Sequence, residues 1–204
     1  VAEKFSQGHK RHVMGWEKMP KIVSGYEDAI EIYDEIIAAL PHHDMTARSL
    51  YGKAVLLKKM KKYRESDDAL QKLITTFYHH ELIPHAHVAL AEVYAEQCRY
   101  QAQNTDILDQ ARLNIKKFKG KYQRDERIKD AEKLFGTMQE THAEELCKIG
   151  ELYERKKKCS ASVIYYASVL KKYPHTKAAK NAKERLKDLK KFAIPLNIPE
   201  ELWQ

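Results

Sequence analysis

The sequence predicts an all-α fold, an α-solenoid of about five helix pairs with one elongated helix and a basic C-terminal capping helix. Glycine and proline are scarce, with 7 and 6 of 204 residues, which argues against a β-sandwich or barrel with many tight turns. The chain is 43% hydrophobic and 32% charged, which suits amphipathic helices and is too apolar for a disordered chain. In addition, one pattern of small and large side chains recurs along the chain.

The recurring pattern is clearest between residues 54 and 77. It consists of Ala54, Leu57, Tyr63, Ser66, Leu70, Leu73 and Phe77. A shift of 96 residues places these positions on Gly150, Tyr153, Cys159, Ser162, Tyr166, Val169 and Tyr173, followed directly by Pro174. Partial copies lie 37 residues earlier, 37 later and 45 later, on Tyr26, Ala29, Tyr33, Ile36 and Leu40, on Ala91, Tyr94 and Tyr100, and on Ala111, Ile115, Phe118 and Tyr122.

This pattern has a physical basis in helix packing. A small residue and a large one three positions later share one face of a first helix, and the small residue lets a second helix approach closely. Large residues at steps of four and three form the apolar stripe of that second helix, and proline then ends the unit. One such hairpin cannot bury its apolar face alone, so stacked copies with a concave surface are expected.

The segments outside the pattern complete the predicted organisation. Gly8, Gly15 and Pro20 interrupt any long helix in the first 20 residues. About fourteen extra residues before Gly150, without proline, predict a long helix over 125–157. Residues 175–192 predict a capping helix with alanines and leucines on one side and lysines on the others. We therefore expect N-terminal repeats at 1–124, the long helix, last repeat and capping helix at 125–192, and an extended tail at 193–204.

The small–large–small–large–proline pattern resembles the tetratricopeptide repeat. Gly150, Tyr153, Ser162, Tyr166 and Pro174 stand at the spacings typical of that repeat. The run LYERKKKCSASVIYYASVLKKYP, with the basic Ala/Lys helix after it, resembles the BamD (YfiO, ComL) outer-membrane assembly lipoproteins. The order of parts is similar too, from AIEIYDEIIAALP early to a long helix late, and the resemblance covers roughly residues 25–190.

The resemblance implies a non-catalytic scaffold on the periplasmic face of the outer membrane, held by an N-terminal lipid anchor that would lie ahead of Val1. It implies two kinds of partner, unfolded outer-membrane proteins and the periplasmic domains of a BamA-like subunit, and no nucleic acid. The alternative is a cytosolic tetratricopeptide chaperone or adaptor. A signal peptide ending in a Leu-x-x-Cys lipobox would distinguish the first possibility from the second.

The resemblance also suggests where partners bind. The first helix of each tetratricopeptide pair lines the inner surface, which predicts a peptide-binding face formed by Arg48, Tyr51, Lys58, His87 and Glu92. The family docks its partner at the C-terminal end, which predicts docking residues Arg155, Lys171, Lys172, Lys183 and Arg185. The two arginines are the strongest of these candidates, because a guanidinium can grip a carboxylate bidentately.

The net charge of +8 lies wholly in the second half of the chain. Residues 1–100 hold 14 basic and 14 acidic residues, whereas residues 101–204 hold 23 and 15. The basic half is either a set of solvated helix faces or a docking surface for an acidic partner or for membrane headgroups. Lysine outnumbers arginine, which disfavours nucleic-acid recognition.

The sequence predicts no catalytic, metal or cofactor site. The pairs His42–His43 and His79–His80 fall in turns between repeats, where adjacent side chains point apart rather than converge on an ion. Cys98, Cys147 and Cys159 are too few for a disulfide framework and are expected to be packing residues. No nucleotide-binding, hydrolase or zinc-protease motif occurs. No apolar run approaches the length of about 18 residues that a membrane span needs.

Overall fold

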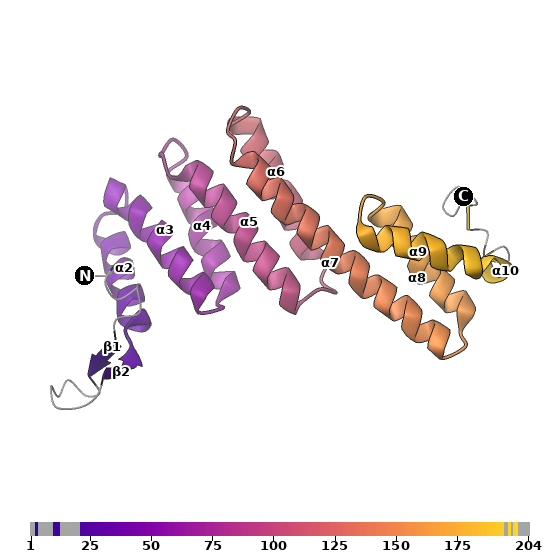
Figure 1. Ribbon diagram of the computed structural model, residues 1–204. Coiled ribbons are helices and arrows are strands. Elements are labelled where there is room, and N and C mark those ends of the chain that lie inside the picture. Colours follow the sequence, from indigo (N-terminus) through magenta and orange to yellow (C-terminus); the bar gives the residue numbers. More distant parts are fainter. Residues whose placement is uncertain (1–2, 4–9, 13–20, 194–195, 197, 200–204) are drawn as a thin grey trace. The chain divides into compact units, whose positions relative to one another are not determined.

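The computed structural model describes residues 3, 10–12, 21–193, 196 and 198–199 (Figure 1). This part of the chain is an all-α, solenoid-like fold in which successive helices pack in pairs, which confirms the predicted fold class. Its helices are α2 (Tyr26–Ala39), α3 (Asp44–Lys59), α4 (Tyr63–Thr76), α5 (Ile83–Tyr100), α6 (Asp106–Lys121), α7 (Ile128–Arg155), α8 (Cys159–Lys172), α9 (Lys177–Asp188) and α10 (Lys190–Ala193).

Two short strands precede the helices. Strand β1 (Lys10–His12) pairs antiparallel with β2 (Lys21–Ser24), so that Lys10 lies opposite Ser24. The register shifts between Arg11 and His12. The sequence predicted only that Gly8, Gly15 and Pro20 interrupt any long helix in this region, and these three residues lie outside the described ones. Most of the expected tail at 193–204 lies outside the described residues.

The observed helix boundaries repeat with the same spacing as the sequence pattern. Helix α3 ends at Lys59 and α4 spans 63–76, whereas α7 ends at Arg155 and α8 spans 159–172. Every one of these boundaries is related to its counterpart by the shift of 96 residues. Helix α2 spans 26–39, which is α4 shifted back by 37. The expected long helix over 125–157 is observed as α7, over 128–155.

The turns inside these two pairs also share one geometry. Lys61 and Lys157, 96 residues apart, have φ angles of 60° and 58°. In the first turn the amide of Lys62 donates to the carbonyl of Leu57 at 2.9 Å, and in the second Lys158 donates to Tyr153 at 2.9 Å. This 6→1 bond is that of a Schellman motif, whose left-handed position glycine usually occupies. Lysine at this position therefore adopts a left-handed conformation that is unfavourable for an L-residue with a side chain.

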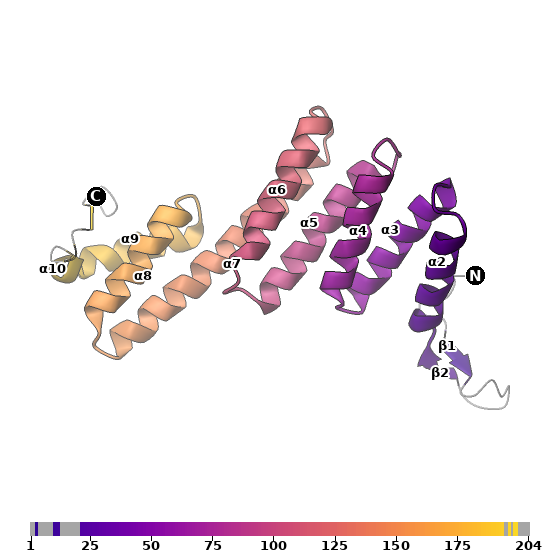
Figure 2. The ribbon, with the colours of Figure 1, turned by 180° about the vertical axis from the view of Figure 1, so that it is seen from behind.

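The chain forms two compact units, residues 1–94 with 114–131 and residues 95–113 with 132–204. In the first unit α3 packs against both α2 and α4 (Figure 2). Ala29 and Leu56 are fully buried between α2 and α3, together with the nearly buried Tyr33. Ser66 of α4 donates a hydrogen bond of 2.8 Å to the carbonyl of Ala54 in α3, and both residues are buried. The small positions of the sequence pattern are therefore the contact points between helices.

The second unit is built on α7, α8 and α9. Gly150 of α7 faces Tyr166 of α8 so closely that a Cβ atom at Gly150 would lie 2.7 Å from the tyrosine ring. Helix α8 packs against α9, whose apolar side is formed by Ala178, Ala179, Ala182 and Leu186. The predicted capping helix therefore exists, although it ends at Asp188 and is followed by the short helix α10.

A carboxylate from α7 closes the amino end of α9. The two oxygens of Glu140 accept hydrogen bonds of 2.8 Å from the amides of Lys177 and Ala178. The hydroxyl of Thr176 accepts a third, of 3.1 Å, from the amide of Ala179. These bonds satisfy donors that a helix start leaves without intrahelical partners, and the negative charge opposes the positive end of the helix dipole. They also join the long helix to the capping helix.

Replacement of Lys157 by glycine is expected to stabilise the protein by about 0.5–1 kcal/mol, because glycine adopts the left-handed conformation without the steric cost of a Cβ atom. The urea midpoint of unfolding measures the change. Lys156→Gly, one residue earlier at a negative φ, is the matched control and is expected to destabilise. A loss of stability in Lys157→Gly would contradict the Schellman geometry.

Glu140→Ala is expected to lower the free energy of unfolding by about 1–2 kcal/mol, because it leaves two amides of α9 without acceptors. The exposed Glu144, one turn further along α7, provides the control Glu144→Ala, which should have little effect. Hydrogen exchange of the amides of Lys177 and Ala178 should also accelerate in Glu140→Ala. Unchanged exchange at both amides would show that the carboxylate does not cap the helix.

Candidate functional site

Residues of α3 and α5, the first helices of two successive pairs, meet on one face of the first unit. The ammonium of Lys58 on α3 bonds the carboxylate of Glu92 on α5. The side chain of Lys58 is 18% exposed, so this ion pair is partly shielded from water. Half-burial raises the pKa of the Tyr51 hydroxyl above its ordinary value, and the charge of Glu92 adds to this effect. Tyr51, Lys58 and Glu92 are thus close neighbours on one face.

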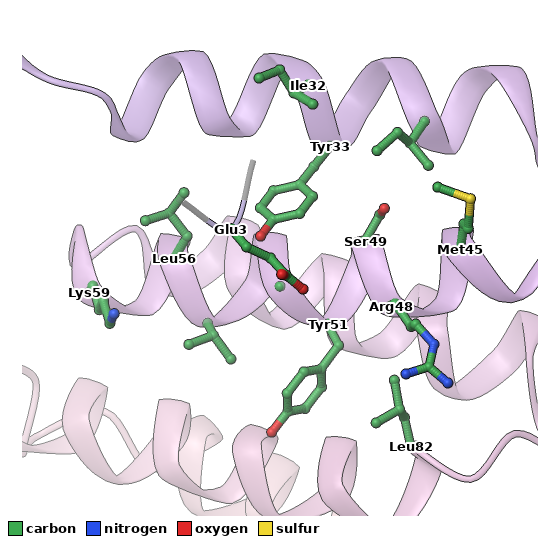
Figure 3. Close-up of a pocket in the computed structure, with 13 residues that line it drawn as sticks. Glu3, Ile32, Tyr33, Met45, Arg48, Ser49, Tyr51, Leu56, Lys59 and Leu82 are labelled. Atoms are coloured by element: carbon green, nitrogen blue, oxygen red, sulfur yellow. The ribbon is translucent and has the colours of Figure 1, made fainter. Parts of the chain in front are cut away.

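A groove of about 700 Å³ runs beside this face, between α2 and α3 (Figure 3). Its walls are mostly apolar, with Ile32 and Ile36 from α2 and Val55 from α3. Lys59 lies at one end and Arg48 at the other. The full lining is Glu3, Ile32, Tyr33, Ile36, Met45, Arg48, Ser49, Tyr51, Gly52, Val55, Leu56, Lys59 and Leu82. A concave, apolar site with a few polar groups at its edge is the usual form of a binding site.

Charged side chains form a network at the Arg48 end. Arg48 donates 2.7 Å and 3.0 Å hydrogen bonds to Asp44 and Glu81, respectively. His80 accepts from the amide of Leu82 through Nδ1, so its Nε2 donates to Asp44 at 2.7 Å. The Arg48 hydrogen bond lowers the pKa of Asp44 below its ordinary value, and the His80 bond adds to this. Because the Arg48 and Glu81 side chains are more than half exposed, these pairs contribute little to stability.

Four of the five predicted peptide-binding residues lie in or beside this groove, whereas the fifth is buried elsewhere. Arg48 and Tyr51 line the groove, whereas Lys58 and Glu92 pair with each other beside it. His87, which was expected on the inner face, is only 3% exposed.

His87 is instead part of the core of the first unit. Its Nδ1 lies 2.6 Å from Oδ1 of Asn114, and its ring stacks on Phe118 with 4.9 Å between centroids. Asn114 in turn donates to the backbone carbonyl of His87 at 2.9 Å. His87 was predicted to face the groove because it lies between packing positions of a first helix. It does lie on α5, but the fold buries it against Asn114 and Phe118 instead.

The predicted docking residues fall into two groups in the second unit. Arg185 of α9 lies 3.9 Å from Glu154, next to Arg155 at the end of α7. Lys171 and Lys172 are exposed at the far end of α8, which is about 20 Å long. Lys183 of α9 is half-buried. These cations therefore do not form one continuous patch, because the length of α8 separates Lys171 and Lys172 from the arginines.

The cysteines and turn histidines are held by local packing. Burial raises the pKa of the Cys98 and Cys147 thiols to about 11, which disfavours a reactive thiolate at either position. In the described part of the chain all three cysteines are free, and no cluster of histidine, cysteine or carboxylate side chains could hold a metal ion. His43 caps α3 by accepting from the amide of Met45.

No helix among the described residues could cross a membrane.

The apolar groove lining was not identified from the sequence. One sequence signal bears on this region. The repeat pattern begins with a small and a large residue, such as Ala54 and Leu57, but the positions 37 residues earlier hold Glu17 and Pro20. The pattern ahead of α2 is therefore incomplete in the sequence. No local sequence pattern predicts that Glu140 caps α9, because the amides that it binds are 37 and 38 residues away in the sequence.

No known family model matches the chain, and a search of curated proteins finds no significant relative.

Two buried histidines make stability depend on pH. Burial lowers the pKa of His87 and of His142 below 6.5, so the folded protein favours the neutral imidazoles. The unfolded chain takes up these protons near pH 6.5, and the folded protein only at lower pH. Stability is therefore expected to be complete above about pH 6.5 and to fall progressively below it. Chemical denaturation at a series of pH values measures this dependence.

His142→Phe should flatten this acid loss. Among the described residues Nε2 of His142 has no hydrogen-bond partner, and its ring stacks near Tyr173, so phenylalanine preserves the shape and removes the titrating group. The exposed His175 provides the control His175→Gln, which should leave the pH profile unchanged. An unchanged profile in His142→Phe would exclude His142 as one of the titrating groups.

Proposed function

We propose that this protein is a non-catalytic scaffold of outer-membrane β-barrel assembly, which binds unfolded outer-membrane protein segments with its first unit. In this proposal it docks through its second unit on the periplasmic domains of a BamA-like subunit. It works at the periplasmic face of the outer membrane, held there by a lipid anchor. The proposal rests on the sequence resemblance to the BamD lipoproteins, together with the geometry of the face described above.

The observation that carries the peptide-binding part is the face of α3 and α5 beside the apolar groove. Tyr51 offers an aromatic surface there, and Lys58 and Glu92 offer both signs of charge. Strands of a membrane barrel alternate apolar and polar side chains. An extended segment of this kind would place aromatic residues against the groove and polar residues against the ion pair.

The docking part is supported by the exposed cations of the second unit. Exposed positive charge attracts an acidic partner and makes the association sensitive to salt. Arg155 is exposed at the end of α7, and Arg185 pairs with Glu154 at the long distance of 3.9 Å. Both guanidinium groups can therefore turn to a partner carboxylate at small cost to the fold.

Photo-crosslinking tests the peptide-binding face. A photoreactive residue in place of Tyr51 or Glu92 is expected to capture a synthetic peptide copied from a barrel strand with alternating aromatic and polar residues. The same group in place of Thr75, which is exposed on α4, is the control and should capture little. Capture confined to positions on α8 would contradict the proposed face.

Charge reversal tests the docking surface. Arg155→Glu and Arg185→Glu are each expected to weaken binding to the periplasmic domains of a BamA-like protein about tenfold, because a guanidinium–carboxylate pair becomes a repulsion. Calorimetric titration at low and high salt measures the effect on the full chain. Lys180→Glu makes the same charge change at another exposed position of α9 and is the control. Salt-independent binding, equal in all variants, would contradict docking through these arginines.

A further inference from the structure

The net positive charge of the first unit is concentrated at the carboxyl end of α6. Residues 1–94, which make up most of this unit, hold 13 basic and 13 acidic residues and are neutral as a set. Residues 116–124 hold five basic residues and no acidic one. We call these five exposed side chains the α6 basic surface: Lys116, Lys117, Lys119, Lys121 and Arg124.

The centre of the α6 basic surface is open. The packed side of α6 faces α5, where Asn114 and Phe118 contact His87 and are buried with it. The lysines lie outside this contact and are exposed. Gly120 stands among these lysines, and a Cβ atom there would lie in open space, more than 4 Å from any packed neighbour. A partner can therefore approach the lysines directly.

The cations of this surface are not neutralised by the fold. In the described part of the chain, no carboxylate forms an ion pair with Lys116 or Lys117. The next acidic residue along the chain, Asp125, pairs with Arg127 at 2.7 Å instead. The positive charge is therefore left to interact with solvent ions or with an anionic partner.

Two tyrosines border the α6 basic surface. Tyr78, which follows α4 and is 56% exposed, is held there by Lys121, whose ammonium donates to its backbone carbonyl. The same ammonium lies 5.1 Å from the centre of the Tyr78 ring and 5.5 Å from that of Tyr122. These are cation–π distances. Aromatic rings with a polar tip therefore stand directly beside the cations.

The position on the helix disfavours a site for a single small anion. Such sites usually use the free amides at the amino end of a helix. The α6 basic surface lies at the carboxyl end, where free carbonyls and the negative end of the helix dipole repel an anion placed close to the backbone. The cations therefore act on negative charge at the tips of their long side chains.

The choice of lysine disfavours recognition of one defined anionic group. Four of the five cations are lysines, and lysine is a mobile point charge, whereas arginine grips a phosphate or carboxylate in a fixed bidentate geometry. Mobile cations suit a surface with many mobile anions, which is how the headgroups of an anionic bilayer are arranged. Tyrosine suits the same place, because its ring and hydroxyl favour the interface between membrane and water.

We propose that the α6 basic surface binds the anionic headgroups of a lipid bilayer, with Tyr78 at the headgroup level. Clusters of about four to eight lysines and arginines bind anionic membranes in this way, and each cation strengthens the association about fivefold. The inference goes beyond the proposed function and does not depend on it, because it assigns a partner to a surface that neither peptide binding nor docking uses.

The opposite charge of α2 would orient the first unit on such a bilayer. Helix α2 contains five acidic residues and no basic one. Four of these acidic side chains are exposed, namely Glu27, Glu31, Asp34 and Glu35. An anionic surface repels them and attracts the end of α6, so the unit would bind with α6 toward the membrane.

Sedimentation with lipid vesicles tests the proposal on the full chain. One set of vesicles contains phosphatidylcholine alone, and the other contains phosphatidylcholine mixed with phosphatidylglycerol, which is anionic. The protein is expected to bind the anionic vesicles at least about tenfold more tightly at about 0.1 M salt. This preference should disappear at about 1 M salt, where charges are screened beyond about 3 Å.

Two double variants locate the binding on α6. Lys116→Gln together with Lys117→Gln should weaken binding to the anionic vesicles about 25-fold, since each cation contributes about fivefold. Arg64→Gln together with Lys72→Gln removes the same charge from exposed positions of α4 and should change the affinity less than about twofold. Because the substituted side chains are exposed, both variants are expected to fold, and matching thermal unfolding curves check this.

A pair of tyrosine variants tests the interfacial ring. Tyr78→Ser should weaken binding to the anionic vesicles, whereas Tyr100→Ser, at another exposed tyrosine, should not. No effect of Tyr78→Ser would overturn the placement of this ring at the headgroup level.

Equal binding to the two kinds of vesicle, or an equal loss in the α4 and α6 double variants, would overturn the proposal. So would a loss in the α6 variant that appears with an oligoglutamate peptide or a single-stranded oligonucleotide and not with vesicles. That result would assign the surface to an acidic protein or to nucleic acid. Capture of a barrel-strand peptide at Tyr51 is measured without vesicles, so the proposed function is tested separately.

Discussion

The close approach of large second-helix side chains to small first-helix residues is the contact on which both units depend. Gly150 faces the ring of Tyr166, and Gly52 faces the hydroxyl of Tyr33, so that a Cβ atom at either glycine would come within 2.7 Å of the tyrosine. The tyrosine is thereby held between helices, and in the second unit its hydroxyl donates to Glu154 at 2.6 Å. A larger residue at either glycine would separate the two helices, and with them the stripes that bury the core.

This constraint explains why so much of the fold could be predicted from the sequence. Spacing of small and large residues is a local property, and it determines which helix faces meet. The boundaries of α3 and α4 reappear in α7 and α8 at the shift of 96 residues because the turn between them has the same hydrogen bonds. Even the left-handed lysines, Lys61 and Lys157, stand at matching positions of the pattern.

The site could be predicted only in part, since it depends on contacts between distant segments. Arg48 and Tyr51, two of the predicted peptide-binding residues, line the groove between α2 and α3. His87 also lies on a first helix, but it pairs with Asn114, 27 residues away in the sequence. No local pattern distinguishes a buried polar pair from an exposed one. The contact of the Glu140 carboxylate with the amides of Lys177 and Ala178 likewise joins segments that are distant in the sequence, so no local pattern predicts it.

Hydrogen–deuterium exchange of the full chain is the most direct test of peptide binding by the first helices. A saturating barrel-strand peptide is expected to slow amide exchange in α3 and in residues 83–94 of α5, and to leave α4 unchanged. Those segments carry Tyr51, Lys58 and Glu92, whereas α4 lies on the other side of α3 from α2. Protection confined to α8, or no protection anywhere in the first unit, would contradict a peptide-binding face on α3 and α5.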